Sequence, residues 1–592
     1  MVEMRSENFI DLHTVPFSVS GSYLSIMLGD LAGQDKGLGE LYLCSERGAA
    51  SLQGRNKLIK LVPAWNGIHV PYSITTTPYE VRIETRYGMI RMTIPGSGLV
   101  RISGSGEIGL EVSSEFRLLN HENIRDMYDG TWQVFYHMIC NMLFVPIKGS
   151  MEMDAPWDYE LTASKYVKAL FVPDGNGEME IALEEFIDFE GKRRNDYPSI
   201  EDSVSAVKES FEKFLQYIPH FRNPEYEEHR VKAAWVSWSH IVSASRRIKR
   251  PTMIMMHTYM SHCSGWQQCT QAVALSGNRE LVYQLLLNIY DFQGEDGMIP
   301  DVVSDFWGVM KAGKPPYQGF AILWLLENAQ LGQFLDKEQI LSLYQPMVKQ
   351  FNWWRNNRIL PGKTLPFFGN PDESGMDDFT VFRKSCQMIT PDIATYLTLF
   401  AEALSKMASM LHIVDEAEYW EQVSRNLLHE MIEKLWDGER FISRVPDTEE
   451  PFASESLCAY QPLLLGKRLP SDIIEKMTSD LSVENDFLTE YGVASEKLSS
   501  PYVNIRGGWA NGPINSPLQM QIVIGLRACG KTELSKLIAN RYCRTLARTG
   551  FFHIHNPFTG KGLDKGRDGV LNQHWTSWSS SVFILLASMY TD

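Results

Sequence analysis

The 592-residue chain lacks any long apolar run, since no hydrophobic stretch approaches the roughly 20 residues that a membrane-spanning helix needs. Its first residues, Met1 to Asn8, are charged and contain no apolar segment, so we expect no secretory signal. The eight cysteines are scattered without the spacing of metal ligands, which predicts that most are reduced, buried thiols and that there is no metal site. These absences favour a cytoplasmic protein whose ligand is a small molecule already inside the cell.

Positive charge is also scarce, because 56 Lys and Arg residues face 72 Asp and Glu residues, for a formal net charge of -16. An acidic surface repels phosphate backbones and anionic lipids, so we expect neither a nucleic-acid partner nor a membrane partner. The one basic cluster of note runs from Arg246 to Arg250, and we interpret it as a solvated helix end. No pattern in the sequence indicates an oligomeric state.

The length exceeds that of one ordinary domain and predicts either two domains or one large helical barrel with an appendage. Hydrophobic residues make up 44% of the chain, which is enough for a large core. Aromatic residues make up 11% and include 15 Trp. Aromatic enrichment suits a carbohydrate-binding cleft, although large cores use the same residues.

Residues 1–195 have the pattern of β-structure. Short alternating runs recur there, separated by Gly, Pro and Ser, and this indicates an antiparallel β-sandwich. Nothing in this region resembles a nucleotide-binding loop, so we expect no cofactor. The runs are Gly39 to Cys44, Tyr79 to Glu84, Met89 to Ile94, Leu99 to Ile102, Ser103 to Val112, Phe144 to Gly149 and Glu178 to Ala182.

Residues 196–225 are predicted to form a helical linker between the two halves. From Asp202 to Tyr217 the apolar residues recur at helical spacing on one face. These residues are Val204, Val207, Phe211, Phe214 and Leu215.

Residues 226–592 are predicted to be one helix after another. Paired helices over this length fit an α/α barrel or an α-solenoid, and the lack of a fixed-period repeat disfavours the solenoid. Loops joining the inner helices of a barrel gather at one end, so distant segments can share a cleft. The expected helices are Glu227 to Ala244, Gln267 to Ala274, Arg279 to Phe292, Gly319 to Leu331, Lys337 to Arg355, Pro391 to Leu411, Val414 to Leu435, Pro470 to Asp480, Ser516 to Gly530, Lys531 to Thr549 and His574 to Met589.

The stretch from Pro371 to Asp378 concentrates carboxylates around Ser374 and Gly375, which favour a turn. Glycoside cleavage needs such a group, because one carboxyl protonates the leaving oxygen while aromatic rings stack on sugar faces. The alternative interpretation is an Asp-rich surface turn. The flanking aromatic residues are Trp353, Trp354, Phe367, Phe368, Phe379 and Phe382.

Other predicted loops also combine polar and aromatic residues. Taken singly, each is a helix cap or a turn, but their recurrence at helix boundaries indicates a shared site. Trp575 and Trp578 are spaced to lie on one helix face, either lining the cleft floor or packing in the core. The loops are Ser264 to Gln268, Gly294 to Asp301, Lys314 to Gly319, Asn504 to Pro513, Gly550 to Gly560 and Gln573 to Ser579.

The order of these motifs resembles the clan of inverting glycosidases that includes family 63 α-glucosidases and family 37 trehalases. Glu373 to Asp377 is similar to the Glu-Ser-Gly-(Trp or Met)-Asp segment of that clan, and Asp296 to Pro300 is similar to its Asp-Gly-Met-Ile-Pro loop. Gly507 to Pro513 is similar to its Gly-Trp-x-Asn-Gly segment, and Pro315-Pro316 before a helix also matches. The resemblance covers roughly residues 250–585 and implies an (α/α)6 barrel with Asp377 as the general acid.

Two positions depart from the family pattern. The family motif Phe-x-Glu-x-Tyr-Asn-Pro-x-Thr-Gly carries the general base as its Glu, and the matching stretch here has His553 at that position. The family's Trp-Asp pair is Trp266-Gln267 here, which removes a substrate-binding carboxylate. An imidazole with an unperturbed pKa of about 6.5 can accept a proton. As a cation, however, it faces an oxocarbenium-like transition state that a carboxylate would stabilise.

Three hypotheses remain open at this stage. In the first, His553, Asp564, Asp568 or Glu295 serves as the base of a hydrolase. In the second, phosphate attacks instead of water, and His553, His555, Lys561, Lys565 and Arg567 gather near that anion. In the third, the barrel binds sugar without cleaving it, or His553 abstracts a proton in a lyase or isomerase reaction. A packing or capping role for His553 and His555 is the structural alternative.

We favour the first hypothesis, with an N-terminal β-sandwich (residues 1–195), a helical linker (196–225) and a catalytic (α/α)6 barrel (226–592). The expected activity is hydrolysis of a small α-linked disaccharide or glucoside with inversion, without a metal or an organic cofactor. Asp377 and His553 are the expected catalytic residues. The expected substrate contacts are Trp266, Gln267, Asp296, Glu373, Arg506, Trp509, Asn511, Trp575 and Trp578.

Overall fold

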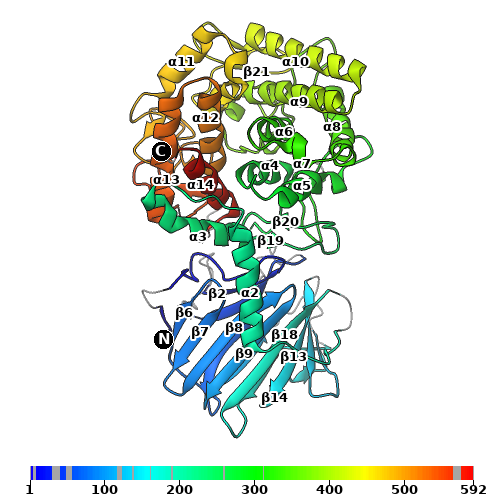
Figure 1. Ribbon diagram of the computed structural model, residues 1–592, viewed down its shortest axis with the longest axis vertical. Helices are drawn as coiled ribbons and strands as arrows, with labels where there is room; N and C mark the ends of the chain where they lie inside the picture. Colours follow the sequence, from blue (N-terminus) through cyan, green and yellow to red (C-terminus); the bar gives the residue numbers. More distant parts are fainter. Residues whose placement is uncertain are drawn as a thin grey trace.

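The computed structural model describes residues 2–4, 8–29, 40–48, 57–115, 123–136, 139–160, 162–187, 191–257, 260–310, 313–563 and 575–590. Strands form the N-terminal region and helices form the C-terminal region, as Figure 1 shows. Within these ranges every helix is too short or too polar to cross a lipid bilayer.

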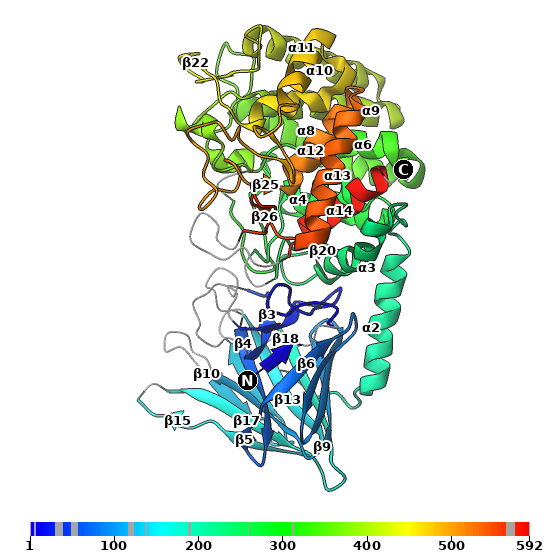
Figure 2. The same ribbon diagram turned by 90° about the vertical axis from the view of Figure 1, so that its left-hand side faces the viewer.

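Two β-sheets stack face to face in the N-terminal region (Figure 2). Their described strands pair in antiparallel fashion, except that β1 pairs with β6 in parallel. The larger sheet has the order β1 (Val2–Met4), β6 (Tyr72–Thr76), β7 (Val81–Thr85), β8 (Gly88–Gly96), β9 (Leu99–Gly106), β18 (Glu178–Phe186), β13 (Cys140–Lys148), β12 (Trp132–Tyr136) and β11 (Asn123–Asp126). The smaller has β14 (Ser150–Asp154), β17 (Tyr166–Val172), β10 (Gly109–Glu115), β4 (Lys57–Trp65), β3 (Leu41–Ser45) and β2 (Leu24–Leu28), with β5 (Ile68–His69) beside β4. A further hairpin joins β15 (Trp157–Asp158) to β16 (Ala163–Ser164).

Alternation of apolar and polar residues explains the core between the sheets. Ile74, Ile83 and Ile90 lie in register across three neighbouring strands, and all three are buried. The predicted run from Ser103 to Val112 is wrong as a single strand, because β9 ends at Gly106 and β10 begins in the other sheet. Gly106 has a φ of +95°, and a Cβ there would lie 2.5 Å from the carbonyl oxygen of Tyr87, so only glycine fits this turn.

The predicted linker helix is present as α2 (Ile200–Leu215), which begins at the capping residue Ser199. It packs along β8 and β9 of the larger sheet and runs up to the helical region (Figure 1). Its buried residues include Val207, Phe211 and Phe214, which lie on the predicted apolar face.

In the described part of the helical region, six helices contact one another in a ring, and six more pack outside them. The ring runs α4, α6, α9, η4, α12, α14 and back to α4. Its members are α4 (Gly265–Ala274), α6 (Gln318–Asn328), α9 (Pro391–Met410), the 3-10 helix η4 (Leu457–Arg468), α12 (Ser516–Ala528) and α14 (Ser577–Met589). The outer helices are α3 (Pro224–Ser239), α5 (Arg279–Asn288), α8 (Lys337–Asn357), α10 (Val414–Leu435), α11 (Ser471–Leu481) and α13 (Thr532–Thr549).

Burial separates the two sets of helices. Every residue of α4 is buried, whereas α10 buries only a stripe at helical spacing. A helix that is covered on all sides is expected in the inner ring, and a helix with one apolar stripe is expected in the outer layer. The short elements between them are η1 (Ile289–Phe292), α7 (Leu331–Phe334), η2 (Pro371–Ser374), η3 (Thr380–Arg383) and the strand pairs β19 (Ile241–Val242) with β20 (Thr252–Met253), β21 (Ser443–Arg444) with β22 (Pro451–Phe452), β23 (Leu488–Thr489) with β24 (Gly492–Val493) and β25 (Ile514–Asn515) with β26 (Ile554–His555).

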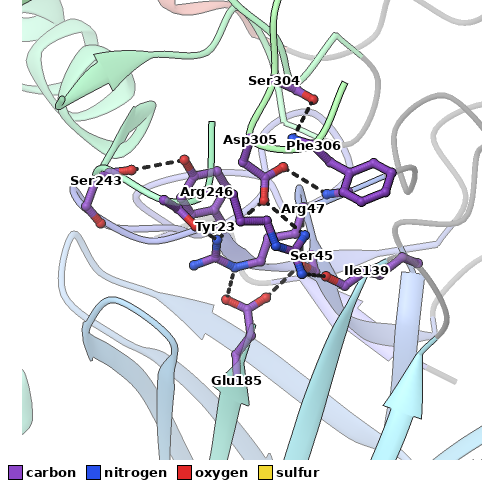
Figure 3. Close-up of polar contacts among 12 residues, drawn as sticks. Tyr23, Ser45, Arg47, Ile139, Glu185, Ser243, Arg246, Ser304, Asp305 and Phe306 are labelled. Carbon is purple, nitrogen blue, oxygen red and sulfur yellow. Dashed lines mark hydrogen bonds and ion pairs between the residues drawn. The ribbon is translucent and has the colours of Figure 1, made fainter. Parts of the chain in front are cut away.

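A buried ion network joins the two regions (Figure 3). Arg47, just after β3, places Nε 2.5 Å from Oε2 of Glu185 in β18 and Nη1 3.5 Å from Oδ2 of Asp305 in the helical region. The carboxylates of Glu185 and Asp305 are fully buried, and the Arg47 side chain is 6% exposed. Asp305 also accepts a hydrogen bond from the backbone N–H of Gly48 at 2.9 Å. Because unpaired buried charge is strongly unfavourable, this network favours one arrangement of the two regions.

The basic cluster from Arg246 to Arg250 is not the predicted solvated helix end. It lies in the loop between β19 and β20, where two of its arginines pair with acidic residues. Nη1 of Arg246 lies 3.4 Å from Asp305, and Nη2 donates to the carbonyl oxygen of Ile139. Arg250 forms two hydrogen bonds to Asp291, at 2.6 and 2.7 Å. Arg247 and Lys249 are exposed, so the cluster is a partly solvated loop whose two other arginines are paired.

Candidate active site

Residues 371–378, here called the acidic loop, fold as the 3-10 turn η2 followed by a left-handed glycine. The side chain of Asn370 caps the turn by accepting from the backbone N–H of Glu373 at 3.1 Å. Gly375 has a φ of +71°, and a Cβ there would lie 2.7 Å from the ring of Trp266. Glycine therefore allows the acidic loop to lie directly against this Trp of α4.

Glu373 holds this loop from inside the protein. Its carboxylate is fully buried and accepts hydrogen bonds from Nε and Nη2 of Arg358 and, at 2.6 Å, from the backbone N–H of Gly369. Both of its oxygens are therefore engaged by protein donors. We infer that Glu373 positions the loop, and this argues against the predicted contact with substrate.

Asp378 joins the acidic loop to the segment around Trp509. Its two carboxylate oxygens accept from the backbone N–H groups of Trp509 and Ala510, each at 2.9 Å. Charge-assisted bonds of this kind fix geometry strongly. Asp377 therefore lies between two anchors, the contact of Gly375 with Trp266 and the bond of Asp378 to Trp509.

The environment of Asp377 favours the protonated form of this carboxyl group more than water does. Its side chain is 32% exposed, and its Oδ1 lies 3.7 Å from Nζ of Lys314. Burial raises the pKa of Asp377 to about 6, against the opposing effect of Lys314. Asp372, Asp301 and Asp378 add to the upward shift of this pKa because they are negatively charged.

Four rings from distant segments form what we call the aromatic cluster: Trp266, Trp509, His553 and Trp578. Trp266 meets Trp578 edge to face at 4.7 Å between centroids, and His553 lies nearly parallel to Trp578 at 6.2 Å. Trp509 lies 5.6 Å from His553 and 6.4 Å from Trp266, which closes the circuit. The acidic loop touches this cluster at Trp266 and at Trp509, so the structure brings Asp377 and the predicted Trp residues 266, 509 and 578 to one place.

His553 is neutral in this setting. Its side chain is buried, and burial, followed by the nearby His555, lowers its pKa to about 4. His555 is also fully buried, its Nε2 lies 3.2 Å from the carbonyl oxygen of Gly550, and burial lowers its pKa to about 4. The structure therefore packs His555 inside the protein, away from any role as an anion-binding cation.

Several buried polar atoms at this site have no hydrogen-bond partner among the described residues. An unpaired buried polar atom costs about 1–3 kcal/mol, and folded proteins leave few of them. A group of such donors and acceptors beside aromatic rings is typical of a ligand-binding site. The atoms include Nε1 of Trp266, Nε1 of Trp578, Oε1 of Gln267, Oδ1 of Asn511 and both ring nitrogens of His553.

Three other residues predicted to contact substrate are not part of the aromatic cluster. Asp296 is exposed, and its carboxylate accepts from the backbone N–H of Met298 at 3.1 Å, which stabilises its own turn. Arg506 is exposed in the loop that carries Trp509. Trp575 precedes α14 rather than lying in it, packs edge to face on Phe551 at 5.2 Å, and so does not share a helix face with Trp578.

Two charged residues that the sequence did not single out complete the surroundings of Asp377. Lys314 places Nζ 3.0 Å from Oδ1 of Asp301, and its side chain is only 12% exposed. Both residues stand at the ends of loops already recognised as motif-rich, Asp301 closing one and Lys314 opening the next. Position at a loop end was the available signal, but the contact of Lys314 with both Asp301 and Asp377 depends on the fold.

The sequence matches the family model of the mannosylglycerate hydrolase MGH1-like glycoside hydrolase domain over residues 261–576, which is more than half of the chain. The chain belongs to this family. It carries a domain of a glycoside hydrolase family, and its resemblance to family 63 enzymes is confirmed.

Individual relatives are more distant. A probable mannosyl-oligosaccharide glucosidase of Schizosaccharomyces pombe is 24% identical over 241 residues, which are 37% of this chain and 29% of the relative. The match thus spans less than a third of that relative's length. A crystal structure of an uncharacterized conserved protein from Thermus thermophilus has a TM-score of 0.50 and 19% identity, covering 60% of this chain and 98% of that chain. A family 63 mannosylglycerate hydrolase from the same organism, in complex with glucose, has a TM-score of 0.49 and 19% identity, with the same coverage. The likeness to the first structure shows the fold of that share of the chain alone.

Proposed function

We propose that this glycoside hydrolase cleaves a small α-linked glycoside with inversion, and that Asp377 is its general acid. The observation that carries the proposal is the position of Asp377 beside the aromatic cluster, with burial raising the pKa of this carboxyl to about 6. A general acid must hold its proton near the working pH, and a raised carboxyl pKa meets that need. The closed ring of inner helices supports an (α/α)6 barrel within residues 226–592, after a β-sandwich (1–195) and a linker (196–225).

We propose that His553 is the general base. Its neutral imidazole can take a proton from water, and its two ring nitrogens have no hydrogen-bond partner among the described residues. A pKa of about 4 makes it a weak base, so the proposal expects slow turnover relative to a carboxylate base. Of the other candidates, Glu295 is exposed on the surface, and Asp564 and Asp568 lie outside the described residues.

Phosphorolysis has less support than hydrolysis. The family match is to a hydrolase domain, and the two histidines that were expected to attract phosphate are neutral above about pH 4. Lys561 is exposed, and Lys565 and Arg567 lie outside the described residues. A non-cleaving sugar-binding protein, or a lyase or isomerase, has no specific contact among the described residues in its favour. A cytoplasmic location and a saccharide or glycoside substrate, with no nucleic-acid or membrane partner, remain part of the proposal.

Product analysis tests the reaction type directly. Incubation with a panel of α-linked disaccharides and glucosides, followed by NMR of the fresh products, should show a β-configured sugar as the first product. Sugar release should not depend on phosphate. A first product that keeps the α-configuration, a sugar phosphate, or an unsaturated or isomerised sugar would contradict inverting hydrolysis.

The pH dependence of kcat/KM follows from the two pKa values. Asp377 must be protonated to act as the acid, so kcat/KM should fall as the pH rises through about 6. His553 must be neutral to act as the base, so kcat/KM should also fall as the pH drops through about 4. A pH-rate profile checks both limbs. The lower limb should disappear in His553→Gln, and its persistence in that variant would exclude His553 as the base.

A further inference from the structure

We propose that Lys314 is a positioning residue whose ammonium group, oriented by Asp301, sets the pH range over which Asp377 holds its proton. This inference rests on the proposed role of Asp377 as general acid. Neither Lys314 nor Asp301 was recognised from the family motifs, and both act on Asp377 through charge.

The backbone places Lys314 against the acidic loop. It precedes Pro315 and Pro316, whose fixed φ angles restrict the approach to α6. The Pro315 ring lies beside Gly375, since a Cβ on that glycine would be 3.3 Å from Pro315 Cδ. Nζ of Lys314 donates to the carbonyl oxygen of Asp372 at 3.0 Å, which ties the side chain to the same loop as Asp377.

Asp301 orients the ammonium from a second segment. Its carboxylate is 14% exposed and lies 3.0 Å from Nζ of Lys314. The backbone around it is ordered as a small hairpin, in which the N–H of Asp301 donates to the carbonyl oxygen of Val309 at 3.0 Å and the N–H of Val309 donates to that of Val302 at 2.9 Å. Asp301 is therefore presented by a fixed backbone to Lys314.

The charges that face Asp377 act in opposite directions. Lys314 favours the carboxylate form of Asp377, whereas burial and the carboxylates of Asp301, Asp372 and Asp378 favour the protonated form. His262 near Lys314 carries no charge at neutral pH, because burial, followed by the Lys314 charge, lowers its pKa to about 4. Lys314 is thus the cation with the largest effect on the pKa of Asp377.

The same contacts argue against a direct role of Lys314 in holding an anionic substrate. Its ammonium is shared among the Asp372 carbonyl oxygen, Asp301 and Asp377, so protein oxygens surround it on three sides. An added anion would have to displace one of these groups. The arrangement instead suits a fixed positive charge that acts on the acid.

The test compares pH profiles of kcat/KM for variants that change one charge each. Lys314→Met removes the cation, so the fall of kcat/KM at higher pH, the upper limb, should move to higher pH by about one unit. Lys314→Arg keeps the cation and should leave that limb close to the wild-type position. Asp301→Asn removes a negative charge and frees the ammonium for Asp377, so the limb should move to lower pH.

Opposite shifts in Lys314→Met and Asp301→Asn would support the proposal, because a purely structural role would lower activity without moving the limb in two directions. An unmoved limb, or shifts of the same sign, would overturn it. If Lys314→Met fails to fold, Asp301→Asn against the wild type decides alone. Asp377→Asn separates the two proposals. If this variant is active, the assignment of Asp377 as the acid is refuted. If it is inactive but the limb does not move in the Lys314 and Asp301 variants, only the role of Lys314 is refuted.

Discussion

Replacement of Asp377 by Asn should lower kcat by about 10²–10⁴-fold, because that is the usual contribution of a general acid. Asn has the same shape and cannot donate a proton to the leaving oxygen. The Asp377 side chain is 32% exposed and its nearest charged partner, Lys314, lies at 3.7 Å, so the fold should tolerate the change. Steady-state kinetics should show the loss in kcat with KM nearly unchanged, because substrate contacts remain in place.

The leaving group gives a sharper version of this experiment. In an aryl glycoside with an acidic phenol, the leaving group departs as a phenolate and needs no proton. Asp377→Asn should therefore lose much less activity on that substrate than on a disaccharide. Asp372→Asn is the matched control when both variants are compared between the two limbs, at about pH 5, because the charge of Asp372 acts on the pKa of Asp377 and so affects the upper limb. Asp372 is exposed in the same loop and contacts Lys314 through its carbonyl oxygen rather than its side chain. Equal losses on both substrates, or equal losses in both variants, would remove Asp377 from the role of acid.

Replacement of Arg47 by Met should destabilise the protein by about 3–5 kcal/mol, the usual effect of removing one partner from a buried ion pair. The change leaves the fully buried carboxylates of Glu185 and Asp305 without their shared cation (Figure 3). Arg246, at 3.4 Å from Asp305, still pairs with that residue, so Glu185 is left with the larger penalty. Denaturant unfolding monitored by Trp fluorescence measures the change.

Arg425→Met provides the matched control for this prediction. Arg425 pairs with Glu421 on the surface of α10 with 66% of its side chain exposed, so its loss should change stability by about 0.5 kcal/mol or less. Asp305 lies in the same segment as Asp301, and we also expect Arg47→Met to lower activity by loosening that segment. Similar free energies of unfolding for the two variants would show that the buried ion network contributes little to stability.

Long periodic helices could be predicted from sequence with accurate bounds. The helix from Val414 to Leu435 has the predicted limits, because its buried residues recur on one face. The helix η4 was missed, although it completes the inner ring. It is buried on nearly all sides, so it has no amphipathic period, and Pro462 and Gly466 interrupt it. Burial on all sides removes the signal on which such predictions depend.

The roles of acidic residues depended on partners far away in the sequence. Glu373 and Asp296 belong to recognised motifs. Both carboxylate oxygens of Glu373 accept hydrogen bonds, from Arg358 and Gly369, whereas Asp296 caps its own turn. Asp301 lies next to one of these motifs but pairs with Lys314 beside Asp377. A carboxylate in a turn has the same local pattern in all three cases, and only its neighbours in space distinguish them.

The sequence by itself determined the β-then-α organisation, most of the helices and the membership of a glycoside hydrolase family, because these follow from local periodicity and from ordered motifs. The tertiary structure decided which of those motifs meet. Gly375 rests on Trp266 and Asp378 binds the backbone of Trp509, so Asp377 is held beside rings from segments more than a hundred residues away. The protonation of Asp377 was also decided there, because it depends on burial and on the balance between Lys314 and the surrounding carboxylates, which no local pattern specifies.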